Sequence, residues 1–541
     1  MHVEKVHIEN FKGYTFYDLS LDKKINILVG NNESKKSTIV DAINLVLTGH
    51  IDNQFLTEER LNPYLFNQEV AQKYITSIKG GETIDPPEIR IELFFPDDLE
   101  LPENYEGHEN FTTQKHKGIG YEISFNEMLR DSYEDMVSNN RELMDSLPLE
   151  YYKIRLYLFS GDEILRTQIP LKSLLIDAVS NNINVSNSII TRIIKNDLES
   201  EDKLKAKRFF RSIKDKYKDD DIHSLISNKI PDKETTASID PSSRNSWDSH
   251  LSVYYKEIPF EYVGKGRQSM MKTDVALRSN KAGEAKVILL EEPENHLSHS
   301  NLLNLLSDIE KNLKNKQVVI TSHSSFVANK LGLHNLKLLS EGDPVTFKDL
   351  DLKTENFFKK LPGYDTLRIL LCEKAILVEG DADELILQKA YKDKHKKIPI
   401  MSGIEVISVN NTYKRFTEIA MALKKKVAVV IDADNSAVTK EEFKKKINAD
   451  SSKLIDVFFE VNDEPQQISD EKFNHNTLEP LLLKYNDLEK LNKIFDTKCE
   501  TSEDLLLYMR SNKTDCALKI FESDEEIVFP KYIQDAIDFV S

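Results

Sequence analysis

Three acidic residues directly follow two apolar runs in the C-terminal half of the chain. Glu379 ends the run that begins at Ala375, and Asp432 and Asp434 follow the run that begins at Val427. Clustered carboxylates repel one another, so such a group is stable with cations bound, and hard oxygen ligands suit Mg²⁺ or Mn²⁺. Taken singly, these acids could be solvated residues at strand ends. Because both runs occur in this order, the pattern favours a metal site.

The two apolar runs must form the elements that bring their acids together. Unbroken β-branched runs are typical of strands that are buried on both faces, as in a parallel sheet covered by helices. Ligands collect at the carboxyl ends of the strands in such a sheet. The predicted fold class of this part is therefore α/β, with a Rossmann-like parallel sheet that places the three acids at one edge.

A second group of candidate residues follows the order strand, polar turn and helix. Residues 25–29 have a strand pattern, the turn begins at Gly30, and an apolar helix pattern starts at Ile39. A phosphate-binding loop has this context, because its backbone N–H groups wrap phosphates at a helix N-terminus. Lys36 would reach the β- and γ-phosphates, and Ser37 would offer a hydroxyl to Mg²⁺. The predicted nucleotide-binding residues of the loop are Gly30, Asn31, Asn32, Ser34, Lys35, Lys36, Ser37 and Thr38.

One position of this loop departs from the usual pattern. Lys35 occupies the place where a glycine normally precedes the lysine. That glycine lets the backbone approach the phosphates without a Cβ in the way. The sequence therefore predicts ATP binding, and it leaves open whether the nucleotide is hydrolysed efficiently.

A third group of residues completes an ATP-hydrolysing site. An apolar strand pattern at 287–290 is followed by two acids. Glu291 would hold the water molecules around Mg²⁺, and Glu292 would activate the attacking water. A further buried strand pattern leads to His323, which could contact the γ-phosphate. Alone, Glu292 could be an acid at a helix N-terminus and His323 a structural histidine. Their order behind a phosphate-binding loop favours the ATPase roles.

Composition and charge limit the classes of protein that fit. The chain has 541 residues, 40% of them hydrophobic and 30% charged, and a net charge of −18. This acidic balance argues against nonspecific coating of nucleic acid, but it permits an enzyme with a local basic channel. Three cysteines without metal spacing favour a reducing cytoplasm and argue against zinc. No membrane span or signal peptide is expected, so the predicted localisation is cytoplasmic.

The length predicts more than one domain. A charged helical pattern after about residue 165 suggests an arm inserted into the ATPase, either for dimerisation or for packing within one chain. Gly264–Ser269 lies where ABC-type ATPases carry the segment that completes a partner's site. The predicted parts are 1–164, first ATPase half; 165–235, helical insertion; 236–345, second ATPase half; 346–370, linker; and 371–541, the C-terminal domain with the acidic strand ends.

These motifs in this order resemble two known groups of proteins. The ATPase motifs and the long insertion resemble the ABC-type heads of SMC proteins and related repair ATPases, which close as dimers with nucleotide between them. The strand ending in Glu379 and the strand before Asp432 resemble the Toprim domain of topoisomerases, primases and OLD-family nucleases. Together they resemble the OLD family across nearly the whole chain, and within it the nuclease subunit of the Gabija antiphage system and OLD nucleases encoded with retrons.

The resemblance assigns roles to residues that are otherwise unremarkable. Thr477, Glu479 and Lys513 stand in a polar tail and would pass for ordinary surface residues. By the family pattern, the catalytic residues are Glu379, Asp432, Asp434 and Lys513. The same pattern assigns metal binding to Glu379, Asp383, Asp432, Asp434, Thr477 and Glu479. Asp383 is shorter than the Glu often found there, so its metal contact could run through water.

The resemblance implies an Mg²⁺- or Mn²⁺-dependent DNA endonuclease with two-metal chemistry, regulated by an ATP-binding domain. It further implies a homodimer or larger homo-oligomer and a role in antiphage defence. The defence partner would be a retron reverse transcriptase with its RNA–DNA product, or a helicase-like subunit. The alternative is an SMC-like ATP-dependent DNA clamp without nuclease activity. A topoisomerase would need a further tyrosine-bearing domain, for which no residues remain.

Overall fold

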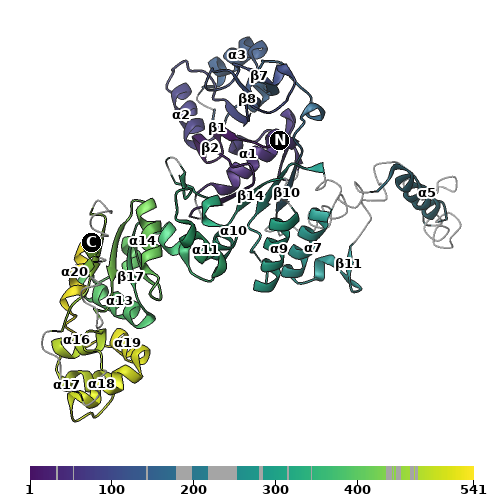
Figure 1. Ribbon diagram of the computed structural model, residues 1–541. Coiled ribbons are helices and arrows are strands. Elements are labelled where there is room, and N and C mark those ends of the chain that lie inside the picture. The colour runs from purple at the N-terminus through teal and green to yellow at the C-terminus, as the bar shows by residue number, and fades with distance from the viewer. Residues whose placement is uncertain are drawn as a thin grey trace. The chain divides into compact units, whose positions relative to one another are not determined.

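The structure of the chain is a computed structural model with two compact units. It describes residues 1–31, 34–52, 54–141, 144–177, 198–216, 229, 253–278, 284–295, 297–312, 316–340, 342, 344–433, 441–442, 444–445, 453–462, 468 and 473–541. The first unit comprises Met1–Ser322 and Leu339–Pro344. The second comprises His323–Leu338 and Val345–Ser541. Both contain sheets and helices (Figure 1), which confirms the predicted α/β class.

An antiparallel sheet forms the N-terminal part of the first unit. Its strands are β1 (Lys5–Phe11), β2 (Tyr14–Ser20), β6 (Ile89–Phe95), β7 (Glu106–Gly107), β8 (His116–Phe125) and β9 (Tyr152–Leu158). They run in the order β2-β1-β6-β8-β7, and β9 also pairs with β8. Alternation of buried and polar residues in β2 suits a sheet with one face on the core.

A parallel sheet forms the other part of this unit and carries the phosphate-binding loop. Parallel strands lie in the order β10 (Ser173–Asp177), β13 (Val287–Glu291), β14 (Gln317–Thr321) and β3 (Ile25–Val29). Helix α1 (Lys36–Thr48) follows β3, and its Ile39, Val40, Ile43 and Val46 are fully buried. The strand–loop–helix order expected around Gly30 is therefore present.

The remaining helices of the first unit are more peripheral. They are α2 (Gln68–Lys79), α3 (Arg130–Asn140), α5 (Ser200–Lys216), α7 (Lys265–Arg278) and α9 (His299–Asn312). Helix α5 is the largest described piece of the predicted insertion, most of which lies outside the described residues. Its 17 residues include none that is buried.

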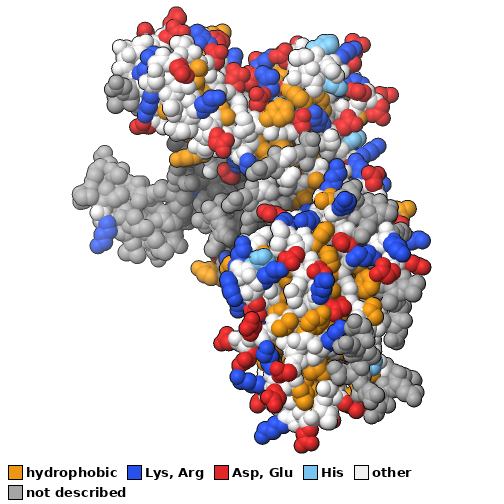
Figure 2. Space-filling view, turned by 90° about the vertical axis from the view of Figure 1, so that its left-hand side faces the viewer, with side chains coloured by type: hydrophobic (Ala, Val, Ile, Leu, Met, Phe, Trp, Pro, Cys, Tyr) orange, Lys and Arg blue, Asp and Glu red, His pale blue; other side chains and the backbone are white. Residues whose placement is uncertain are grey.

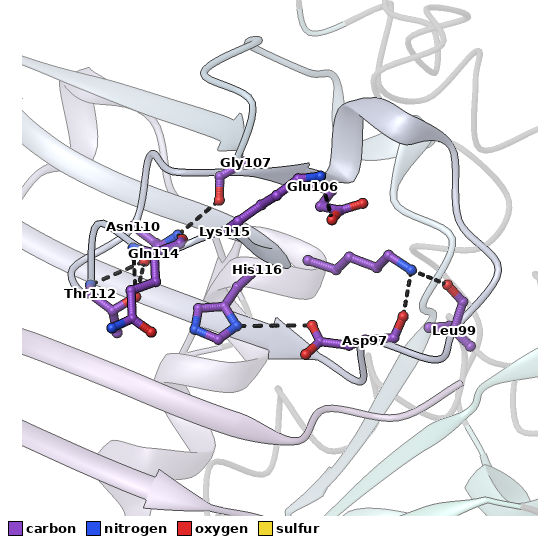
Figure 3. A network of polar contacts seen from close by, with 10 residues as sticks. Asp97, Leu99, Glu106, Gly107, Asn110, Thr112, Gln114, Lys115 and His116 are labelled. Carbon is purple, nitrogen blue, oxygen red and sulfur yellow. Dashed lines mark hydrogen bonds and ion pairs between the residues drawn. The ribbon is translucent and has the colours of Figure 1, made fainter.

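The loop between β7 and β8 is tied down by its own polar groups (Figure 3). The Asn110 amide donates to the carbonyl oxygens of Gly107 and Gln114 at 3.2 and 2.8 Å. Lys117 donates to two carbonyl oxygens in the turn after β6, at 2.6 and 2.9 Å. These hydrogen bonds hold the loop in place beside β7 and β8.

The second unit is built on a four-stranded parallel sheet. The strand order is β18 (Ile404–Ser408), β17 (Lys374–Val378), β19 (Lys426–Val430) and β20 (Ile455–Phe458). Helix α13 (Asp381–His395) follows β17, and α14 (Tyr413–Ala422) follows β18. The apolar runs predicted as strands thus form the two central strands, β17 and β19. In both of them four consecutive residues are buried.

Helices make up most of the rest of the second unit. α16 (Leu478–Tyr485), α17 (Leu488–Phe495), α18 (Ser502–Ser511) and α19 (Lys513–Glu522) form one group, coloured yellow-green to yellow in Figure 1. α19 packs against α13, and α20 (Lys531–Val540) packs against β17, β19 and β20. The segment before β17 contains α10 (Ser325–Leu331), β15 (Leu336–Leu338), β16 (Val345–Thr346), α11 (Leu352–Lys360) and α12 (Thr366–Leu371).

Helices α11 and α12 lie where a linker was expected at 346–370. They are ordered against α10 by a buried amide, because Asn329 donates to the carbonyl oxygens of Pro362 and Tyr364 at 3.2 and 2.7 Å. The Thr366 hydroxyl completes the group by donating to the Asn329 carbonyl at 2.8 Å. These short helices have little periodic apolar pattern in the sequence, because long-range hydrogen bonds help to hold them in place.

Arg368 of α12 connects this segment to the parallel sheet. Its guanidinium donates to Glu405 of β18 at 2.8 Å and to Glu384 of α13 at 3.1 Å. Glu384 also accepts the backbone N–H of Ser408 at 3.2 Å. The start of α13 is therefore anchored on two sides.

In the described part of the chain, no helix is both long and apolar enough to cross a membrane.

Candidate functional site

The carboxyl edge of the second unit's parallel sheet brings four acids together. Glu379 follows the last residue of β17, and Asp432 comes two residues after β19 ends. Asp383 lies in the first turn of α13, where one carboxylate oxygen accepts the Gly380 N–H at 3.0 Å. Glu479 lies in the first turn of α16 and is 6% exposed.

Thr477 and Lys513 hold Glu479 in this cluster. The Thr477 hydroxyl donates to one Glu479 oxygen at 2.9 Å, and the Lys513 ammonium lies 2.9 Å from the other. Lys513 is the first residue of α19. α13, α16 and α19 thus all begin at this edge of the sheet, where the positive ends of their dipoles favour negative charge.

The electrostatics of the acids show that they share one site. Burial raises the pKa of Asp383 to about 6, and the charges of Glu479 and Glu379 add to this effect. Burial also raises the pKa of Asp432 well above its ordinary value, and the charges of Asp383, Glu379 and Glu479 reinforce it. Burial alone would lower the pKa of Lys513, but the same acids raise it above its ordinary value.

The residues of this edge fit a hard divalent cation. Four carboxylates and a hydroxyl are oxygen donors of the kind that Mg²⁺ and Mn²⁺ prefer. One ammonium cannot balance them, and their mutual repulsion adds to burial in raising the pKa values of Asp383 and Asp432. Within the residues described, which exclude Asp434, no three acidic, histidine or cysteine side chains already form a metal-coordinating group. The metal-binding roles of these residues therefore stay predictions.

The unfolding free energy of the metal-free protein should depend on pH in a defined window. Asp383 has a folded-state pKa of about 6 against an ordinary value of 3.8, and that of Asp432 is raised further in the same direction. In this range the folded state binds more protons than the unfolded state, so stability falls as pH rises. Urea unfolding in EDTA between pH 4 and 7 should show this decrease. The prediction would be contradicted if the unfolding free energy stayed constant or rose between pH 4 and 7 and if Asp432→Asn had no effect on this dependence.

The first unit gathers most of the predicted ATPase residues around Lys36. Its ammonium donates to the carbonyl oxygens of Gly30 and Asn31 at 2.9 and 3.0 Å and lies 3.2 Å from the Ser34 hydroxyl. Burial lowers the pKa of Lys36, whereas the charges of Glu292 and Glu294 raise it. The phosphate-binding loop and the end of β13 therefore face the same region.

Glu292 is held in place by side chains that the sequence analysis did not single out. Asn295 donates to its carboxylate at 2.6 Å, and the Ser322 hydroxyl donates to Glu294 at 2.8 Å. The Glu292 backbone has a positive φ of 40° and bonds to Thr321 of β14. Glu291 ends β13 as expected. Asn295 and Glu294 could have been noticed, since they stand directly behind the two acids.

For two further predicted residues the assigned roles stay predictions. His323 directly follows Ser322 and is assigned to the second compact unit. Asn32 lies outside the described residues. Gly264, in the signature-like segment, directly precedes α7, and its carbonyl accepts the N–H groups of Arg267 and Gln268. That segment therefore begins a helix, and its role toward a partner stays a prediction.

Lys35 takes the backbone conformation that a glycine would supply. Its φ and ψ are 59° and 25°, in the left-handed region, at the N-cap of α1. Its side chain lies over the β1–β2 turn: a Cβ added to Gly13 would lie 2.7 Å from Lys35 Cδ, and the ammonium is 5.4 Å from the Tyr14 ring. The loop keeps its shape at the cost of strain, and the extra charge points toward the aromatic ring.

The chain matches two family models. The model for the "Overcoming lysogenization defect protein-like, TOPRIM domain" matches residues 370–434, and the model for an "AAA ATPase domain" matches residues 1–62. Among curated proteins, the Retron Ec83 probable ATPase of Escherichia coli is 44% identical over 59 residues. That match covers 10% of this chain and 11% of the relative.

Parts of the chain are also similar to solved structures. The C-terminal region of the Xanthomonas campestris pv. campestris OLD protein is 20% identical and covers 32% of this chain and 94% of its own, with a TM-score of 0.24. An Smc head domain with an extended coiled coil, derived from Pyrococcus furiosus, is 13% identical. It covers 66% of this chain and 99% of its own, with a TM-score of 0.34.

The two family models, in this order along the chain, define an ATPase–Toprim protein. ATPase domains use nucleotides and Toprim domains use divalent metals, so both kinds of ligand follow from the class. Within that class, the segment that contains β17, α13 and β19 matches the OLD-like (overcoming lysogenization defect protein-like) Toprim model.

Proposed function

We propose that the chain is an Mg²⁺-dependent DNA endonuclease whose Toprim domain cuts phosphodiester bonds under the control of its nucleotide-binding domain. The observation that supports this function best is the cluster of Glu379, Asp383, Asp432 and Glu479 beside Lys513. Divalent cations bound by such acids activate water and neutralise the leaving oxygen. The chain's own ammonium would stabilise the charge that develops on the phosphate.

The test is cleavage of supercoiled plasmid by the purified full-length protein. Mg²⁺ or Mn²⁺ should produce nicked and linear DNA, and EDTA should abolish both products. An SMC-like clamp without nuclease activity would bind plasmid in an ATP-dependent manner and leave it supercoiled. That outcome, with metal present and with and without ATP, would replace the nuclease by the clamp.

Such an enzyme can bind DNA without a strongly basic surface. Acidic and basic side chains are interspersed over the described residues on the face shown in Figure 2. With a net charge of −18, long-range attraction of DNA is weak. Local contacts and bound divalent cations would then carry more of the affinity for DNA.

The nucleotide-binding domain would act as a gate and not as part of the cutting chemistry. Lys36 donates to loop carbonyl oxygens and Asn295 donates to the Glu292 carboxylate, which supports binding and hydrolytic roles for Lys36 and Glu292. A slow ATPase fits a gate that stays closed while cellular nucleotide is abundant. The local similarity to a retron ATPase supports a role in antiphage defence. The partner would be a reverse transcriptase with its RNA–DNA product, or a helicase-like subunit.

Replacement of Lys35 by glycine should accelerate ATP turnover. A left-handed conformation costs a non-glycine residue about 1 kcal/mol, and glycine adopts it freely. Lys35→Gly removes both the strain and the Cβ near the phosphates, whereas Lys35→Ala removes the charge but keeps the Cβ. We expect several-fold faster phosphate release from Lys35→Gly and little change from Lys35→Ala. Equal rates in wild type and Lys35→Gly would show that Lys35 does not limit hydrolysis.

The protein should form at least a homodimer. The Gly264–Ser269 segment has a nucleotide role only when it is presented to the phosphate-binding loop of another copy. Multi-angle light scattering with ATP and Mg²⁺ should give at least twice the 62.3 kDa of one chain. A mass of one chain at micromolar concentration would contradict the arrangement. Glu292→Gln, which should trap ATP, provides a version in which dimers persist.

A further inference from the structure

Tyr532 is a buried polar residue that the function proposed above does not use. It is the second residue of α20 and is 5% exposed. A buried phenol normally has a hydrogen-bond partner, because leaving its hydroxyl unpaired costs free energy. Among the described residues no hydrogen bond of the Tyr532 hydroxyl is found, although its oxygen is not one of the fully buried polar atoms without a partner. The hydroxyl can therefore donate to a further group.

Both ends of α20 show which way the helix runs along the sheet. At its C-terminus, the carbonyl oxygens of Val540 and Ser541 accept from the ammonium of Lys374, the first residue of β17, at 2.7 and 3.0 Å. At its N-terminus, the Lys531 N–H donates to Glu460, which follows β20, at 3.1 Å. α20 thus runs antiparallel to the strands. Its first turn lies at the carboxyl edge of the sheet, where the acids are.

The surroundings of Tyr532 agree with this placement. Burial raises the pKa of the Tyr532 phenol well above its ordinary value. The charges of Asp432, Asp383 and Glu479 raise this pKa further. These are three of the four acids of the cluster, with Asp432 contributing most among them. A phenol is protonated at physiological pH in any case and can donate a hydrogen bond to a carboxylate.

We propose that Tyr532 is a positioning residue of the metal centre, whose hydroxyl donates a hydrogen bond to the Asp432 carboxylate when a divalent cation is bound. A bound cation would draw the carboxylates into one arrangement, and a fixed donor behind one of them would hold its orientation. Partners of this kind behind a metal ligand typically change metal affinity by about 10–100-fold. This inference rests on the proposed function, since it assumes that Asp432 binds the metal.

The first test measures Mn²⁺ binding to the full-length protein by isothermal titration calorimetry. Tyr532→Phe removes only the hydroxyl and keeps the ring in the core. Tyr391→Phe is the matched control, because Tyr391 is equally buried on α13 but stacks on His395 away from the acids. We expect Mn²⁺ affinity to fall about ten-fold in Tyr532→Phe and to stay at the wild-type value in the control. Unchanged affinity in Tyr532→Phe would overturn the proposal.

A double substitution separates positioning from general destabilisation. If the hydroxyl acts through Asp432, then Tyr532→Phe should weaken Mn²⁺ binding no further in an Asp432→Asn background. Additive losses of affinity would show a merely structural effect and overturn the inference. These measurements do not use DNA. A protein that binds Mn²⁺ with this pattern but leaves plasmid intact would refute the nuclease and retain the role of Tyr532.

Discussion

Asp432→Asn should lower plasmid cleavage by about 10³-fold or more while making the metal-free protein more stable. Even one transition-state-stabilising donor is worth about 10²–10³-fold in rate, and loss of a metal-binding carboxylate should cost at least as much. The same carboxylate is repelled by Asp383, Glu379 and Glu479, which together with burial raise its pKa. An uncharged amide of the same shape relieves that repulsion.

The two effects of Asp432→Asn have opposite signs, which makes the test specific. A substitution that merely damages the fold would lower activity and melting temperature together. Cleavage at saturating Mn²⁺ and thermal unfolding in EDTA should be measured on the same preparation. Asp381→Asn serves as the control, because Asp381 is an exposed acid in the same first turn of α13. Cleavage by Asp432→Asn at the wild-type rate would show that the metal site lies elsewhere.

Lys513→Met should lower the single-turnover cleavage rate by about 10²–10³-fold without weakening metal binding. Lys513 lies 2.9 Å from Glu479 and its pKa is raised by the surrounding acids, so it remains a cation in the site. In cleavage it would stabilise charge on the phosphate, but it also competes with a metal ion for Glu479. Methionine keeps the length of the side chain and removes only the charge.

Binding and catalysis should therefore separate in Lys513→Met. Calorimetry should show Mn²⁺ affinity equal to or higher than that of wild type, and rapid-quench cleavage should show the loss in rate. Lys531→Met is a suitable control, since Lys531 is an exposed lysine at the start of α20. A wild-type rate in Lys513→Met, or a loss of metal affinity that explains the lower rate, would remove Lys513 from the catalytic group.

Local sequence predicted the elements that carry the site better than it predicted the site itself. The apolar runs that begin at Ala375 and Val427 form the central strands β17 and β19. They could be predicted because an unbroken apolar run is a local pattern that does not depend on residues elsewhere in the chain. The acids behind them could be placed at one edge by the geometry of parallel strands alone. Glu479 and Lys513 were assigned only through a family resemblance. In the fold, the Lys513 ammonium at the start of α19 lies 2.9 Å from the Glu479 carboxylate in the first turn of α16.

The remaining features depend on contacts that no local pattern records. Tyr532 is one of 20 tyrosines, and only the antiparallel course of α20 places it beside the acids. Lys35 could be recognised as a departure from the loop pattern. Its left-handed backbone and its position over Tyr14 could not be predicted from the sequence, because both depend on how the loop folds. In each case the deciding interaction joins residues that lie far apart, or depends on a dihedral angle.

The hydrogen bonds of Asn329 bear on how this gene could have been assembled. Asn329 lies in a segment that follows the ATPase strand β14, yet its partners Pro362, Tyr364 and Thr366 stand immediately before the Toprim strand β17. A recombination joint at residue 345 would pair α10 from one ancestor with α11 and α12 from another. In such hybrids the backbone carbonyl oxygens that accept from Asn329 could be displaced, and the Thr366 hydroxyl that donates to it could be lost. Exchange of modules between relatives should therefore favour joints that keep α10, α11 and α12 together.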